Sequence, residues 1–456
     1  MRANHSPWVY QLDTNRPIKK IHTDTTTDVV IVGGGIAGIS TAFFALKYTN
    51  KKVVLCDRFR VGHGATGHNA GQIVSYFERP FQDLVREFGL EKAARSQHAI
   101  ESAWTLLDEM YNDAGLSIPL ARFDGHVGVQ TKEQLISFLE DLRLRREAGL
   151  PQEVLRIAFE ITDIMEVELA PYVGLYTLVP HKNILELLET HNELFIACLS
   201  YQKGVMNSAL FVQCVVMYLE RVYAERFTLF EDTMIQKVLV HDTGVTLDAT
   251  LATIQARHVI LCTNGFEHFS LITEQGLDLN VRFHAHVWSR VGYMSAYLDR
   301  FTKPPTAISY LNTDVPSTDQ TYFYVTRRPF EYDGNAAYNL ICIGGGDPDR
   351  ILNEKERYSH TDEYPEEAIR SINTFLHTTI DEGEQIAREY IFTWHGLMGY
   401  TKNFVRMIGL DPEYASVGYN LGCNGIGILP SIYGGKRIAQ LLAGDTVEPT
   451  IFDITL

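Results

Sequence analysis

The residues that could do chemistry begin with a glycine pattern near the start of the chain. Gly33-x-Gly35-x-x-Gly38 follows the apolar run DVVIV (28–32) and opens IAGISTAFFALKYT (36–49). A buried strand, a tight glycine turn and a helix in this order present backbone N–H groups and the positive end of a helix dipole to a diphosphate. The pattern therefore predicts a dinucleotide-binding unit.

An acid and a second glycine-rich stretch follow this unit. Asp57 ends the next apolar run, KKVVLCD (51–57), at the distance where such units place an acid on the adenosine ribose. The stretch RVGHGATGHNAGQI (60–73) comes directly afterwards. Glycine is costly to order, so a folded chain uses it where backbone must closely approach another group. An NAD-dependent dehydrogenase has no use for this stretch, whereas a flavin nucleotide extends past the second strand. The pattern favours FAD.

Taken together, these motifs resemble those of the FAD-dependent D-amino-acid-oxidase-like superfamily. Within it, the chain is most similar to gamma-glutamylputrescine oxidase and its glycine- and sarcosine-oxidase relatives. The resemblance is carried by DVVIVGGGIAG (28–38), GHGATGHNAGQI (62–73), ARHVILCTNGF (256–266), YNLICIGGG (338–346), WHGLMGYTKNFVRMIG (394–409) and LGCNGIGILPSIYGGKRIAQLLAG (421–444). It implies an α/β fold in which a Rossmann-like FAD-binding domain is interleaved with an α+β substrate domain built on a mostly antiparallel sheet.

The resemblance also implies which residues contact FAD. In the family, the second glycine segment runs along the cofactor toward the flavin ring, and the turn GCNGIG (422–427) faces the pyrimidine end of that ring. The implied cofactor-binding residues are Gly33, Gly35, Ile36, Ala37, Gly38, Asp57, Arg58, Gly64, Ala65, Thr66, His68, Asn69, Ala70, Gly71, Gln72, Ile235, Thr263, Asn264, Gly265, Gly399, Gly425, Ile426, Gly427 and Ile428.

His68 raises a separate question. In relatives of dimethylglycine dehydrogenase, the pattern G-x-T-x-H-x-A-G carries a histidine that is bonded covalently to the flavin. Residues 64–71 fit this spacing. Closer relatives carry arginine at the position of His68 and bind FAD without a covalent bond. We favour non-covalent FAD, with His68 as a polar loop residue.

The chain also departs from the family pattern. Asp57 stands where relatives usually carry glutamate, and Ser208 stands where a proline is expected. Lys402 and Asn403 follow Thr401 where many relatives have threonine and then aspartate, and residues 180–205 look lengthened or replaced. Most of these departures fall in the substrate half. The resemblance therefore does not transfer a particular substrate.

The reaction that the resemblance implies is oxidation of a C–N bond in a small amine or amino acid. A neutral amine loses hydride to flavin N5, and the resulting imine is hydrolysed. Tyr322 and Tyr324, followed by Arg327 and Arg328, resemble the place where carboxylate-binding relatives have a tyrosine and an arginine. At most one of the two adjacent arginines can point inward from a strand, and we select Tyr322 and Arg328 as the candidates. Arginine binds a carboxylate through two parallel hydrogen bonds. His395 could assist proton transfer, or it could be an ordinary buried histidine.

The possible partners are a small-molecule substrate and an electron acceptor, either oxygen or an electron carrier. An alternative is a flavin-binding structural or regulatory subunit with little catalysis of its own. The net charge of −16 argues against a nucleic-acid partner, because phosphates need a basic surface. His284 and His286 alternate on one strand without an evident third ligand, so no metal site is predicted.

Periodicity places the elements that must position these residues. Helices are expected at 90–112, 131–147, 208–225 and 363–379, and the region 282–345 is strand-rich. We expect an N-terminal arm at 1–27, an FAD-binding domain made of 28–90, 205–275 and 385–456, and a substrate domain made of 91–204 and 276–384.

The bulk composition is that of an ordinary globular protein. The most apolar stretch, 204–223, is interrupted by polar residues, so a buried helix is expected there and no transmembrane segment. None of the six cysteines forms a CxxC pair. Most of them lie within apolar strand or helix patterns. This placement favours a reducing, cytoplasmic setting over a zinc site or a disulfide framework.

Overall fold

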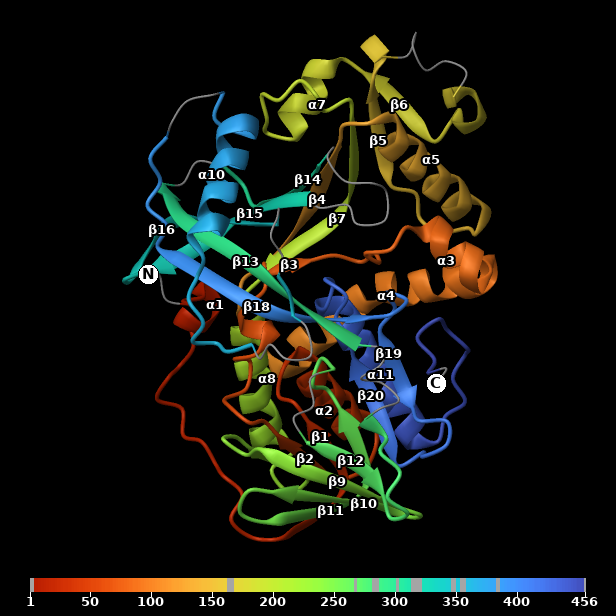
Figure 1. Ribbon diagram of the computed structural model, residues 1–456, viewed down its shortest axis with the longest axis vertical. Helices are drawn as coiled ribbons and strands as arrows, with labels where there is room; N and C mark the ends of the chain where they lie inside the picture. Colours follow the sequence, from red (N-terminus) through yellow and green to blue (C-terminus); the bar gives the residue numbers. More distant parts are fainter. Residues whose placement is uncertain are drawn as a thin grey trace.

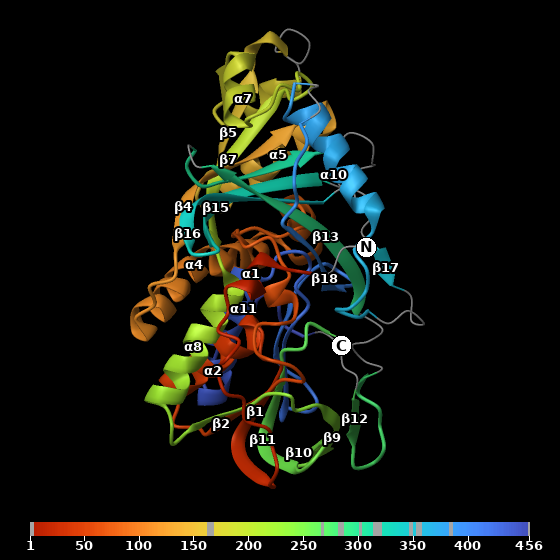
Figure 2. The ribbon, with the colours of Figure 1, turned by 90° about the vertical axis from the view of Figure 1, so that its left-hand side faces the viewer.

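The computed structural model describes residues 4–161, 168–265, 269–280, 287–300, 303–312, 322–345, 350–352, 358–382 and 386–454. Within these residues the chain forms two sheets, one in each half of an elongated molecule (Figures 1 and 2). The helices are α1 (Pro7–Tyr10), α2 (Ile36–Tyr48), α3 (Phe81–Phe88), α4 (Leu90–Ala114), α5 (Lys132–Glu147), α7 (His181–Leu187), α8 (Ser208–Val222), α10 (Glu366–Thr379) and α11 (Ile428–Ala443).

The first sheet lies in the lower half of Figure 1. Its strand order is β12 (Ser270–Thr273), β9 (Ile235–His241), β10 (Gly244–Ala249), β11 (Thr253–Leu261), β1 (Thr25–Val32), β2 (Val53–Cys56) and β8 (Phe227–Phe230), with β20 (Val417–Leu421) beside β11 and β19 (Met407–Leu410) beside β20. Strands β8, β2, β1, β11 and β20 run parallel. They are apolar on both faces because helices α2, α8 and α11 cover one face and a second apolar cluster covers the other.

The second sheet lies above the first in both views. Its order is β17 (Arg350–Leu352), β13 (Val287–Arg300), β16 (Asn335–Gly345), β15 (Tyr322–Tyr332), β14 (Thr306–Leu311), β4 (Leu120–Val129), β7 (Ala197–Met206), β5 (Val154–Ala158) and β6 (Tyr176–Val179), with β18 (Phe392–Thr401) beside β13 and β3 (Gln72–Ile73) beside β7. Among the described strands of this second sheet, only the pairs β14–β4 and β5–β6 are parallel. The predicted combination of a Rossmann-like sheet with a mostly antiparallel sheet is confirmed.

The expected helices form, and their ends have local causes. Helix α5 begins with a capping box, in which the Thr131 hydroxyl accepts from the Gln134 N–H and the Gln134 side chain accepts from the Thr131 N–H. The Asn207 side chain caps α8 by accepting from the Leu210 N–H. The next residue is Ser208, which stands where a proline was expected. In the described part of the chain, no helix is both long and apolar enough to cross a membrane. All six cysteines are free, and the cytoplasmic setting stays a prediction.

Strand pairing places two segments differently from the expected domain boundaries. Strand β18 was expected with the FAD-binding segments, yet it pairs with β13 in the second sheet. Strand β3 likewise pairs with β7. Helix α4 was expected in the substrate domain, but its buried residues pack in the core that α2, α8 and α11 share. The chain therefore passes between the two halves more often than the predicted boundaries suggest, and the boundaries themselves stay a prediction.

The turn between β1 and α2 depends on two close backbone approaches. Gly33 has a φ of +108°, and a Cβ there would lie 2.5 Å from the carbonyl oxygen of Cys262 after β11. A Cβ on Gly38 would lie 1.8 Å from the carbonyl oxygen of Gly33. These glycines therefore let the first turn of α2 sit directly against the ends of β1 and β11.

We predict that Gly38→Ala lowers the free energy of unfolding by more than ~3 kcal/mol, above the usual range for overpacking, because the clash is with backbone. Gly64→Ala is the matched control, since its Cβ would meet no atom within 4 Å. Chemical denaturation of both variants checks this. Equal destabilisation by the two substitutions would contradict the packing role of Gly38.

Candidate active site

A cavity of about 390 Å³ is lined by residues from both halves of the molecule. Most of the predicted site residues meet there, although they come from distant parts of the chain. The predicted residues on its wall are Gly33, Gly35, Ile36, Ala37, Asp57, Arg58, Gly64, Ala65, Thr66, His68, Asn69, Ala70, Gln72, Ile235, Thr263, Asn264, Tyr322, Gly425, Ile426, Gly427 and Ile428.

The remaining predicted glycines lie behind this wall and let its parts come together. A Cβ on Gly399 would be 1.9 Å from the carbonyl oxygen of Asn264, and one on Gly71 would be 2.8 Å from that of Met206. Gly265 similarly faces Val287. Together with Gly38, these positions shape the wall and do not line it.

Two helix N-termini open onto the cavity. Helix α2 starts after Gly35 and α11 starts after Gly427, and neither has a side-chain cap at that residue. The residues around both starts line the cavity. The Thr66 hydroxyl, from the second glycine segment, accepts from the Ile36 N–H at 2.9 Å. An uncapped helix start presents N–H groups and a partial positive charge, which suits an anionic or electron-rich ligand.

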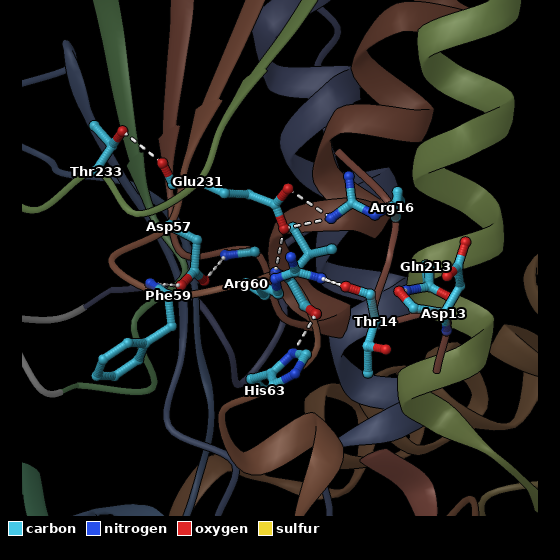
Figure 3. Close-up of polar contacts among 12 residues, drawn as sticks. Asp13, Thr14, Arg16, Asp57, Phe59, Arg60, His63, Gln213, Glu231 and Thr233 are labelled. Carbon is cyan, nitrogen blue, oxygen red and sulfur yellow. Dashed lines mark hydrogen bonds and ion pairs between the residues drawn. The ribbon is translucent and has the colours of Figure 1, made fainter. Parts of the chain in front are cut away.

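Asp57 directly follows β2 beside the glycine turn, and backbone N–H groups fix its carboxylate (Figure 3). One oxygen accepts from the Gly34 N–H at 2.7 Å and the other from the Phe59 N–H at 2.8 Å. Burial raises the pKa of Asp57. The carboxylate retains lone pairs for ribose hydroxyls.

The expected N-terminal arm (residues 1–27) fastens the second glycine segment (residues 60–73). Trp8, fully buried in α1, donates from its indole nitrogen to the carbonyl oxygen of Asn69 at 2.5 Å. The Ser6 hydroxyl donates to the carbonyl oxygen of Gly67 at 2.5 Å. Arg60 donates to the carbonyl oxygen of Thr14 at 2.8 Å.

A buried ion pair completes this attachment at the other end of the segment (Figure 3). Arg16 of the arm pairs with Glu231, which is fully buried just after β8. The same Glu231 accepts from the Val61 N–H at 2.8 Å. The arm therefore holds the glycine segment at two separate places. No pattern in the sequence indicates this role.

His68 lies on the cavity wall as a neutral imidazole. Its Nδ1 is 2.9 Å from the carbonyl oxygen of Gly64, so Nδ1 carries the proton and Nε2 keeps its lone pair. Burial lowers the pKa of His68 to about 4. The neighbouring ring of His360, 5.1 Å away between centroids, also lines the cavity.

Two of the predicted catalytic residues do not reach the cavity wall. Arg328 is buried with its guanidinium 5.0 Å from the Trp8 ring, and its Nη1 lacks a hydrogen-bond partner. Arg327 points to the other face of β15, where it forms a double hydrogen bond with Glu189. His395 is fully buried, with Nε2 2.8 Å from the carbonyl oxygen of Asp362. Their catalytic roles stay predictions without support from this geometry.

Other polar side chains, which sequence reasoning missed, do line the cavity. They include Tyr76, Glu78, Arg290 and Tyr400. Tyr324, which the sequence had placed beside Tyr322, lines the cavity as well. Tyr322 joins them, since its hydroxyl donates to Glu78 at 2.8 Å. These residues share no motif, because they come from β13, β15, β18 and the segment after β3. No local signal in the sequence could have grouped them.

No metal site accompanies this cavity among the described residues, which contain no cluster of three or more histidine, cysteine, aspartate or glutamate side chains placed to hold an ion. His284 and His286 lie outside the described residues.

The family described as FAD dependent oxidoreductase (DAO) matches residues 28–441 of the chain. The chain belongs to this family. Gamma-glutamylputrescine oxidoreductase of Escherichia coli (strain K12) is 32% identical over 93 residues, which make up 20% of this chain and 22% of that protein. The match thus spans about a fifth of this curated relative.

Solved structures share the fold over nearly the whole chain. Glycine oxidase from Geobacillus kaustophilus has a TM-score of 0.65 at 17% identity, covering 95% of this chain and 99% of that one. L-alpha-glycerophosphate oxidase from Mycoplasma pneumoniae, with FAD bound, has a TM-score of 0.63 at 14% identity, covering 94% and 99%. At these identities the likeness shows the fold.

The residues of this FAD-dependent oxidoreductase fit its cofactor. The start of α2, apart from the Ile36 N–H that bonds Thr66, and the start of α11 offer N–H groups for a diphosphate and for an electron-rich ring, and Asp57 offers acceptors for a ribose. A Cβ at Gly64 would meet no protein atom within 4 Å, so its Cα faces open space. We assign FAD contacts to these residues as a proposal.

We predict that Trp8→Phe weakens FAD binding by roughly 2- to 10-fold, the value of one hydrogen bond, because the Asn69 carbonyl keeps only the longer bond from Trp394 at 3.3 Å while the ring still packs. Fluorescence titration of the apoprotein with FAD measures this. Tyr10→Phe is the control, since the Tyr10 hydroxyl bonds Asp333 and not the glycine segment. Unchanged affinity in Trp8→Phe would contradict the fastening role of the arm.

Proposed function

We propose that this FAD-dependent oxidoreductase oxidises the C–N bond of a small amine or amino acid. The observation that supports this most directly is the pairing of charges on the cavity wall. Glu78 supplies an anion and Arg290 a cation, among tyrosine side chains. Such a wall suits a small ligand that carries an amine, with or without a carboxylate. Bound FAD supplies the hydride acceptor at flavin N5.

The protein's own residues orient the substrate and exclude water. Arg290 of β13 replaces Arg328 as the carboxylate-binding group, because Arg290 lines the cavity and Arg328 does not. Its guanidinium lies 5.6 Å from the ring centroid of Tyr400 and 5.5 Å from that of Trp288, which hold it against the wall. Tyr322 and Tyr324 from β15 also line the cavity, with their ring centroids 5.8 Å apart.

Loss of hydride from the α-carbon of a neutral amine leaves a protonated imine, which water hydrolyses to a carbonyl compound and an ammonium ion or a smaller protonated amine. This sequence needs orientation and a dry cavity more than extensive acid–base groups. The electrons then pass to oxygen or to an electron carrier. We propose non-covalent FAD, with His68 as a neutral wall residue.

A direct test mixes the purified FAD-loaded protein anaerobically with a panel of primary amines, secondary amines and α-amino acids. We expect bleaching of the flavin absorption by at least one compound and formation of the matching carbonyl product. Mixing the reduced protein with oxygen then identifies the acceptor. No bleaching by any compound would favour the structural or regulatory subunit.

Acid precipitation of the loaded protein tests the FAD linkage. We expect the yellow colour to enter the supernatant, because His68 makes no bond to the flavin in this proposal. Colour retained in the pellet, and lost from it in His68→Ala, would overturn the non-covalent assignment.

For an amino-acid substrate, we predict that Arg290→Gln raises KM by about 10- to 100-fold, the value of a charge-assisted hydrogen bond to a carboxylate. The matched comparison is the same substrate without its carboxylate, for which KM should change little. Steady-state kinetics on both compounds gives the answer. An equal rise in KM for both compounds would instead indicate a structural role for Arg290.

A further inference from the structure

Six arginine side chains are buried among the described residues, and four of them pair with a carboxylate. The four pairs are Arg16 with Glu231, Arg145 with Glu101, Arg327 with Glu189 and Arg437 with Asp453. Such pairing is expected, because a charge removed from water is costly unless an opposite charge lies beside it. The two exceptions are Arg328, whose guanidinium lies against the Trp8 ring, and Arg406.

Of these two exceptions, only Arg406 lines the cavity. It is 6% exposed and directly precedes β19. Burial lowers its pKa, and the ionisable groups that also act on this pKa are the thiols of Cys423 and Cys262, with no carboxylate of the described chain among them. An arginine nevertheless keeps its proton in a protein. Arg406 is therefore a permanent buried cation without a counter-charge in the described part of the chain.

The guanidinium of Arg406 is fixed on one side by Asn420 of β20. Its Nε donates to the side-chain oxygen of Asn420 at 2.8 Å, and its Nη2 donates to the carbonyl oxygen of the same residue at 2.9 Å. Within the described residues these are its only acceptors, so Nη1 is left for a group inside the cavity that Arg406 lines. The cation is thus oriented before any ligand binds.

Asn420 also places this cation near the starts of two helices. Its side-chain nitrogen donates to the carbonyl oxygen of Ser431, in the first turn of α11, at 3.0 Å, and to that of Ala37, in the first turn of α2, at 3.5 Å. Both helix starts carry partial positive charge and open onto the cavity without a side-chain cap. Positive charge close to Arg406 raises the cost of burying it, so the site is matched when an anion enters.

We propose that Arg406 provides the counter-charge of the FAD diphosphate and binds it through Nη1. The diphosphate carries negative charge in every redox state of FAD, whereas the oxidised flavin ring is neutral. A permanent buried cation is therefore matched by the diphosphate and not by the ring. Arg406 adds a side-chain charge to the backbone N–H groups at the start of α2. This contact concerns cofactor binding and applies whichever substrate is oxidised.

The test compares two ligands on the full chain freed of FAD. ADP carries a diphosphate and adenosine has none, and competition with FAD, followed by flavin fluorescence, measures the affinity of each. In Arg406→Gln we expect ADP and FAD to bind about 10- to 100-fold more weakly, the value of a charge-assisted hydrogen bond. Adenosine should bind as it does to the natural protein.

Two further variants control this experiment. Arg406→Lys retains a cation, so it should bind ADP more tightly than Arg406→Gln does. Lys402→Gln removes an exposed cation from the preceding turn and should leave both affinities unchanged. Unchanged ADP affinity in Arg406→Gln would overturn the proposal. Equal weakening of ADP and adenosine would also overturn it, because the substitution would then act through the shape of the cavity and not through the diphosphate.

The other candidate for this charge is the flavin ring, which can become an anion when it is reduced. The midpoint potential of the FAD-loaded protein separates the two assignments. We expect the potential of Arg406→Gln to equal that of the natural protein, because the diphosphate has the same charge in both redox states. A more negative potential with unchanged ADP affinity would assign Arg406 to the reduced ring and reject our proposal. These readouts need no substrate, so a failure of the proposed amine oxidation would leave them interpretable.

Discussion

The rest of the structure depends on the contact between the first turn of α2 and the ends of β1 and β11. Gly38 approaches the carbonyl oxygen of Gly33 too closely for any side chain, and Gly33 approaches Cys262 in the same way. Because these backbones touch, the start of α2 points its N–H groups into the space beyond the strands. That space is one end of the cavity, and its position relative to both sheets follows from this contact.

The second glycine segment poses the opposite problem, since it has little regular structure to hold it. Residues this rich in glycine lose much conformational freedom on folding. The protein offsets this loss with contacts from elsewhere: Trp8 and Ser6 of the arm, the buried Arg16–Glu231 pair, and Ser208 at the start of α8, which donates to the Thr66 carbonyl. An apparently irregular arm thus serves as a support of the cofactor site.

The polar end of the cavity combines neutral and charged groups in a confined space. Hydrogen bonds and ion pairs are stronger there than in water, and unpaired charges are costlier. Tyrosine hydroxyls kept neutral by burial, such as that of Tyr322, can donate to Glu78 without changing its charge.

The sequence by itself determined the features that are local. The spacing of Gly33, Gly35 and Gly38 between a strand and a helix, followed by Asp57 and the glycine segment 60–73, was sufficient to indicate FAD, and family membership now bears this out. The long helices were equally readable, because a helix needs only neighbours a few residues apart. Such patterns specify the local backbone structure without help from distant residues.

Only the tertiary structure decided which distant side chains meet. Strand alternation allowed one of Arg327 and Arg328 to face inward, but it could not show that Trp8 would cover Arg328, or that Arg290 from another strand would reach the cavity. Glu78 and Tyr322 are separated by 244 positions in the chain and bond at 2.8 Å. The physical reason is that sheet register and packing, which bring such residues together, are set by the whole core and by no local pattern.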